Sequence, residues 1–136
     1  MMQKKVQIIS DGSLDLSQEL TKEKDIEVVP FYVSFDSETY QKEMVEVGVR
    51  EFYQEMVDHP TVFPKTSMPS VHDYYEVFEK YAKEQLPVIC ICITRKFSGS
   101  LQSATTAKDM ILEEYRMHRS RSLTLRSILC YRGYMY

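Results

Sequence analysis

The stretch PVICICI, residues 87–93, restricts the fold of this chain more than any other segment. It is a continuous apolar run of strand length, whereas a strand with one face in water alternates apolar and polar residues. Such a run is typical of a strand buried on both faces of a parallel sheet. Because parallel strands are joined by crossovers, usually helices, the flanking segments should alternate between strand and helix.

The rest of the chain follows that alternation. The predicted elements are strands at residues 5–10 and 25–35 and helices at residues 13–24, 49–59, 70–85 and 100–115. Pro30 makes the second strand irregular, and Ser13 and Ser70 are candidate helix N-caps. Residues 36–47 read as a polar loop. We therefore predict an α/β domain with a mainly parallel sheet flanked by helices.

Composition limits the class of protein. The chain has 136 residues, of which 43% are hydrophobic, enough for one modest domain. A net charge of -3 does not indicate a nucleic-acid partner. We find no apolar run of membrane-span length and no signal-peptide core, and three cysteines do not suit a disulfide framework. These features predict a cytoplasmic protein.

Residues 116–136 differ from the rest of the chain. They contain five arginines and no Lys, Asp or Glu, whereas the other residues carry 12 basic and 20 acidic groups. The segment is interpreted as a basic surface tail, as an arm for an acidic partner or nucleic acid, or as a frameshifted or truncated end. We favour the last, because composition and pattern change together, and expect a domain at 1–115, a disordered or frameshifted tail at 116–136, and little loss of melting temperature when the tail is deleted.

Three polar stretches follow strands or precede helices: SDGSLD at 10–15, KTSMPS at 65–70 and TRKFSGS at 94–100. Ligands of α/β sheets bind at the carboxyl ends of strands, near helix N-termini with unpaired N–H groups. Hydroxyls there add donors that suit a carboxylate or a phosphate. Taken singly, each stretch is better explained by helix capping than by ligand binding.

Catalytic and metal-binding patterns are weak. The histidines, at His59, His72 and His118, are scattered without metal-ligand spacing. Cys90 and Cys92 fit two small core residues, and Asp11 fits a turn-stabilising acid better than a metal ligand. We predict no catalytic residue, no metal and no cofactor. The alternative is a hydrolase or phosphate-ligand enzyme with Ser98 as nucleophile, which needs a base within about 3.2 Å.

The motifs SDGSLDLSQEL, FPKTSMPS and FSGSLQSA, in this order, resemble the DegV family of bacterial fatty-acid-binding proteins over roughly Val6 to Tyr115. The resemblance implies a two-domain α/β protein that holds one long-chain fatty acid in an apolar tunnel. It also implies a non-enzymatic carrier that presents the carboxylate to a fatty acid kinase for phospholipid synthesis.

The resemblance assigns carboxylate binding to Thr66, first in T-S-x-P-S, and to Ser98, in the S-G-[ST] turn. Ser67 and Gly99 adjoin them as second contacts. Neutral hydroxyls and helix-end amides hold a carboxylate without an ion pair, so its oxygens stay nucleophilic for phosphoryl transfer on another protein.

The chain departs from the family in two loops and in length. Arg95, Lys96 and Phe97 stand where small or hydroxyl residues are usual, and YQKEMVEVGV replaces a D-G-x-D-I-T pattern. Family members are about twice as long, so we expect the second domain to be absent. A half-tunnel would then be exposed, and self-association through this apolar surface is a further expectation.

Overall fold

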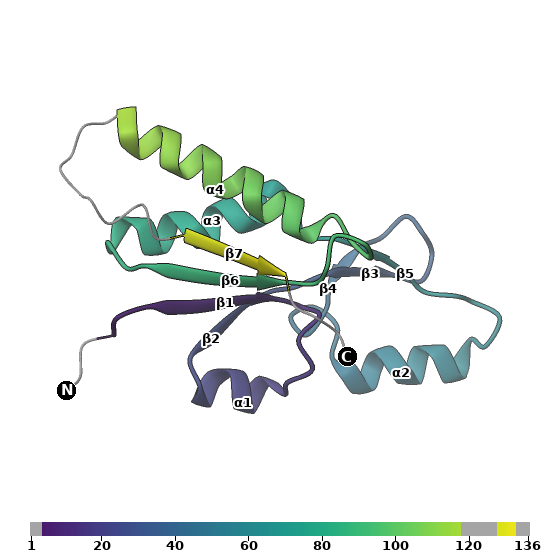
Figure 1. Ribbon diagram of the computed structural model, residues 1–136. Coiled ribbons are helices and arrows are strands. Elements are labelled where there is room, and N and C mark those ends of the chain that lie inside the picture. Colours follow the sequence, from purple (N-terminus) through teal and green to yellow (C-terminus); the bar gives the residue numbers. More distant parts are fainter. Residues whose placement is uncertain (1–3, 118–127, 133–136) are drawn as a thin grey trace.

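The computed structural model describes residues 4–117 and 128–132 and has the predicted α/β architecture (Figure 1). The elements in chain order are β1 (Gln7–Asp11), α1 (Gln18–Glu23), β2 (Ile26–Val29), β3 (Tyr32–Ser34), β4 (Gln41–Lys42), α2 (Val49–Asp58), β5 (Lys65–Ser67), α3 (Val71–Lys83), β6 (Val88–Cys92), α4 (Ser100–Met117) and β7 (Ile128–Arg132). A parallel sheet has the strand order β2-β1-β6-β7, and a smaller antiparallel sheet has the order β4-β3-β5.

The core lies between the parallel sheet and the two long helices. Helices α3 and α4 cover one face of this sheet, and α1 lies on the opposite side (Figure 1). The buried cluster includes Ile9, Val88, Cys90 and Cys92 from the strands and Tyr74, Phe78, Ala104, Ala107 and Ile111 from the helices. Small residues on α4 let the two helices and the sheet approach closely.

The prediction that residues 87–93 are buried on both faces is wrong in part. Val88, Cys90 and Cys92 face the helices and are buried, but Ile91 on the other face is 39% exposed. Ile8 on β1 is 37% exposed. The reason is that α3 and α4 cover the same face, while α1 packs against β2.

Pro30 divides the predicted strand 25–35 into two strands of different sheets. β2 ends at Val29 and pairs with β1, whereas β3 begins at Tyr32 and pairs with β4 and β5. Pro30 has no N–H to donate to a ladder, so it suits the crossing point. No strand was predicted at KTSMPS, but its first three residues form β5, with Thr66 opposite Val33.

Of the two predicted helix N-caps, Ser13 is wrong and Ser70 is confirmed. The N-cap of α1 is Ser17, whose Oγ accepts the Leu20 N–H at 3.2 Å, so the prediction of Ser13 is wrong. The Ser70 cap of α3 is confirmed: Ser70 Oγ accepts the Asp73 N–H at 3.1 Å, and Asp73 Oδ2 accepts the Ser70 N–H at 2.8 Å. This reciprocal pair is a capping box.

The predicted boundary at Tyr115 does not mark the end of the fold. Helix α4 continues to Met117, and β7, inside the predicted tail, pairs in parallel with all five residues of β6. A tail outside the fold is therefore wrong for residues 128–132. The backbone ladder of β7 depends on a pairing partner, which composition and periodicity do not reveal. The predictions for residues 118–127 and 133–136 lie outside the described residues.

Candidate ligand-binding site

Asp11 joins three segments at the carboxyl end of the parallel sheet. Its side chain is fully buried. Oδ1 accepts the N–H of Ser13 at 3.1 Å and also the Ser13 hydroxyl, while Oδ2 accepts the Ile93 N–H at 2.9 Å and the Ser100 hydroxyl at 2.8 Å. The acid thus holds together the turn after β1, the end of β6 and the first residue of α4, as a buried and fully hydrogen-bonded carboxylate must.

The predicted turn at Ser98 and Gly99 precedes α4. Ser98 is half-buried, its Oγ accepts the Ser100 N–H at 3.2 Å, and its own N–H donates to the Thr94 carbonyl at 3.3 Å. A Cβ on Gly99 would lie 2.5 Å from the Met68 Sδ atom. The Met68 side chain thus packs against the Gly99 backbone, which brings the segments of the two predicted hydroxyl motifs into contact.

Thr66 and Ser67 belong to β5 and are exposed. Thr66 stands opposite Val33 in the antiparallel ladder, and directly paired residues have side chains on the same face. Val33 is buried and lines a pocket, so Thr66 lies on the strand next to a pocket wall.

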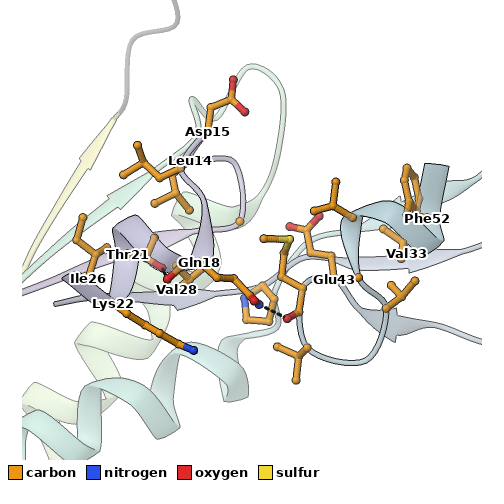
Figure 2. Close-up of a pocket in the computed structure, with 18 of the residues that line it drawn as sticks. Leu14, Asp15, Gln18, Thr21, Lys22, Ile26, Val28, Val33, Glu43 and Phe52 are labelled. Atoms are coloured by element: carbon orange, nitrogen blue, oxygen red, sulfur yellow. Dashed lines mark hydrogen bonds between the residues drawn. The ribbon is translucent and has the colours of Figure 1, made fainter. Parts of the chain in front are cut away.

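The pocket has a volume of about 460 Å³ and lies between α1, β2, β3, the segment 43–48 and α2 (Figure 2). Its apolar lining includes Leu14, Leu16, Ile26, Val28, Val33 and Phe52. This volume is in the range of small-molecule sites, about 300–1,000 Å³. None of the four predicted carboxylate-binding residues lines it; Thr66 stands opposite Val33, which is a lining residue, in the ladder between β3 and β5.

Glu43 is the most constrained charged residue of the pocket. Its N–H donates to the Phe31 carbonyl at 3.0 Å, and its Oε1 accepts the Phe31 N–H at 3.3 Å. Burial raises the pKa of Glu43 and the negative charge of Asp11 raises it further, although the Phe31 N–H opposes this shift. The carboxylate fills the space that a Cβ on Gly12 would occupy. Glu43 therefore fixes one pocket wall against the turn after β1.

The segment 43–48 keeps a tight turn without the usual glycine. Met44 has a φ of 62° and donates its N–H to the Val47 carbonyl at 2.8 Å, and the Gln18 amide donates to the Met44 carbonyl. Segment 43–48 was not predicted to line a pocket, because its residues show neither helical nor strand periodicity. Gly12 was predicted only as part of the turn at residues 10–15.

The described residues restrict other chemistry. Within residues 4–117 and 128–132, no group of three His, Cys, Asp or Glu side chains could hold a metal ion. In the same part of the chain, no helix is both long and apolar enough to cross a membrane. Among these residues, no histidine, lysine or carboxylate is hydrogen-bonded to Ser98, whose Oγ accepts the Ser100 N–H.

A model of the family described as "Uncharacterised protein, DegV family" matches residues 5–131. The chain belongs to the DegV family. The match extends beyond Tyr115 and includes most of β7, so the family region is longer than the sequence motifs indicated.

Relatives in the DegV family agree with this assignment. A DegV domain-containing protein of Halalkalibacterium halodurans is 40% identical over 108 residues, 79% of this chain and 38% of the relative. One from Clostridium acetobutylicum is 34% identical over 110 residues, 81% of this chain and 39% of the relative. The chain thus spans about two-fifths of the length of these relatives.

Solved structures of similar proteins share the fold. A stearic acid-binding protein from Eubacterium ventriosum superposes with a TM-score of 0.83 at 42% identity, covering 93% of this chain and 40% of that protein. A fatty-acid-binding DegV protein from Thermus thermophilus gives a TM-score of 0.67 at 26% identity, with 94% and 40% covered.

Proposed function

We propose that this chain binds a long-chain fatty acid, with the acyl chain in the pocket and the carboxylate at the hydroxyls of Thr66 and Ser98. Ser67 and Gly99 supply further contacts through side chain or backbone. The observation that carries the proposal is an apolar pocket of about 460 Å³ next to β5, the strand that contains Thr66. Fatty acids need such an apolar slot and a few fixed donors for the head group.

The turn before α4 offers donors of the required kind. Because Ser98 Oγ accepts the Ser100 N–H, the Ser98 hydroxyl proton is available to a ligand. The N-terminus of α4, an 18-residue helix, adds a partial positive charge. Arg95 and Lys96 are exposed in the same loop and attract an anion at longer range.

The proposed role is that of a cytoplasmic, non-enzymatic carrier for phospholipid synthesis. A carboxylate held by neutral hydroxyls keeps nucleophilic oxygens, so a partner fatty acid kinase would phosphorylate it while this chain supplies only binding. The alternative, a Ser98 hydrolase, is not favoured, because among the described residues Ser98 lacks a hydrogen-bonded base.

Titration of delipidated protein with hexadecanoic acid, followed by calorimetry, tests the proposal. We expect saturable binding, and we expect Thr66→Val and Ser98→Ala each to weaken it by about 1.5–3 kcal/mol, the range for hydrogen bonds to charged groups. Thr61→Val, at an exposed threonine of the loop before β5, is the matched control and should leave affinity unchanged. Unchanged affinity in both site variants would place the head group elsewhere, and no uptake by the wild type would refute the function.

A further inference from the structure

A chain of buried polar groups runs behind the Ser98 turn. Ser100 Oγ donates to Asp11 Oδ2 at 2.8 Å and lies 2.5 Å from the Tyr74 hydroxyl, which lies 3.5 Å from Cys92 Sγ. Asp11, Ser100, Tyr74 and Cys92 are each at most 1% exposed. This series of hydrogen-bonded side chains thus runs from the end of β1 through α4 and α3 to β6, and it is out of contact with water.

The carboxylate of Asp11 sets the direction of the two hydrogen bonds that Ser100 Oγ makes. An ionised carboxylate accepts only, so the Ser100 proton points to Asp11, and Ser100 Oγ can then only accept from Tyr74. Burial, and next the neighbouring Cys92 thiol, raise the pKa of Tyr74 far above its usual value, which keeps this donor protonated. The hydroxyl protons of Ser100 and Tyr74 therefore both point toward Asp11.

The same residue, Ser100, contacts the proposed ligand donor through its backbone. Its N–H donates to Ser98 Oγ at 3.2 Å. Asp11 holds the Ser100 side chain from one side, and Tyr74 holds it from the other, so the Ser100 N–H has a fixed direction. With one lone pair of Ser98 Oγ occupied, the Ser98 O–H is directed away from α4.

We infer that Asp11, acting through Ser100, is a positioning residue that orients the Ser98 hydroxyl toward the carboxylate of the bound lipid. This inference rests on the proposed function. It assigns Asp11 a role that turn stabilisation alone does not require, because three of its four hydrogen bonds would serve the turn and the strand end without Ser100. The consequence is head-group selectivity: the buried chain should favour a carboxylate over a neutral head group on the same acyl chain.

The test measures the ratio of affinities for hexadecanoic acid and hexadecanol, two probes that differ only in the head group. Loss of fold stability lowers both affinities together, whereas loss of Ser98 orientation lowers only the affinity for the acid. We expect Ser100→Ala to reduce the acid-to-alcohol ratio roughly two- to tenfold, the effect of one weakened hydrogen bond. Ser103→Ala, the same change at a buried serine one turn further along α4, should leave the ratio unchanged.

A double variant and Asp11→Asn complete the experiment. Once Ser98→Ala has removed the oriented hydroxyl, adding Ser100→Ala should have little further effect on the ratio. Asp11→Asn places an amide against two donors, so a folded Asp11→Asn variant should have a lower acid-to-alcohol ratio. If the Asp11→Asn variant does not fold, Ser100→Ala still decides the test. An unchanged ratio in Ser100→Ala overturns the positioning role while acid binding stands. A wild type that binds neither probe overturns the proposed function and this inference together.

Discussion

Gln85 is a non-glycine residue that holds a strained, left-handed backbone conformation. It follows α3 with a φ of 56° and is exposed. Its N–H donates to the Ala82 carbonyl and the Leu86 N–H donates to the Tyr81 carbonyl, both at 3.0 Å, which is a Schellman motif. Glycine is the usual residue at this left-handed position because it has no Cβ.

We therefore expect Gln85→Gly to raise the free energy of unfolding by about 0.5–1 kcal/mol, through relief of the left-handed strain. Urea denaturation measures this change. Gln54→Gly is the matched control, because Gln54 is exposed within α2, where glycine costs about 1 kcal/mol. Destabilisation by both substitutions would show that the αL strain at Gln85 is negligible.

At the scale of an element, the N-terminus of α3 is tied to the small sheet. Asp73 closes the capping box with Ser70, and both of its carboxylate oxygens accept the Tyr32 hydroxyl of β3 at 3.0 Å. Burial opposes ionisation of Asp73, but the hydrogen bonds from Ser70 and Tyr32 outweigh it and lower the pKa of Asp73. Burial, together with the same contact, raises the pKa of Tyr32 to about 12.

This arrangement predicts acid sensitivity. A carboxylate with a lowered folded-state pKa stabilises the fold fully above its unfolded pKa of about 4, and the contribution is lost as the pH falls through the folded value. We expect Asp73→Asn to lower the free energy of unfolding by about 1 kcal/mol at pH 7. Urea denaturation at decreasing pH should show this difference shrinking below about pH 4. A difference that stays constant with pH would contradict the lowered pKa.

At the scale of the whole molecule, β7 completes the parallel sheet. It pairs with β6 over five registers, from Val88 opposite Ile128 to Cys92 opposite Arg132. Without β7, the N–H and C=O groups of β6 would form an open sheet edge. The segment predicted to be dispensable therefore includes a structural strand.

Truncation after Tyr115 should lower the melting temperature by about 5–10 °C, the shift that loss of a few kcal/mol produces in a domain of this size. Differential scanning calorimetry would measure it. Truncation after Arg132 is the control, because it retains every described residue, and it should shift the melting temperature by less than about 2 °C. Equal melting temperatures for both truncations would mean that β7 adds no stability.

Local patterns predicted the parts of the site that are local. The Ser70 capping box, the turn before α4 and the apolar strand β6 each depend on residues within one turn or one strand. The motif resemblance selected Thr66 and Ser98 as a pair, and the structure places their segments in contact at Met68 and Gly99. The assignment of these hydroxyls to a carboxylate stays a prediction.

The sequence by itself determined the alternation of strands and helices, the parallel sheet and the family, because hydrophobic period, cap residues and motif spacing are written along the chain. Only the tertiary structure decided that Pro30 separates two sheets, that β7 joins β6, that segment 43–48 walls the pocket, and that Asp11 reaches Ser100. These features depend on contacts between residues far apart in the chain, such as the 89 positions that separate Asp11 from Ser100. Such pairings are chosen by packing and by the need to satisfy buried polar groups, neither of which leaves a local pattern.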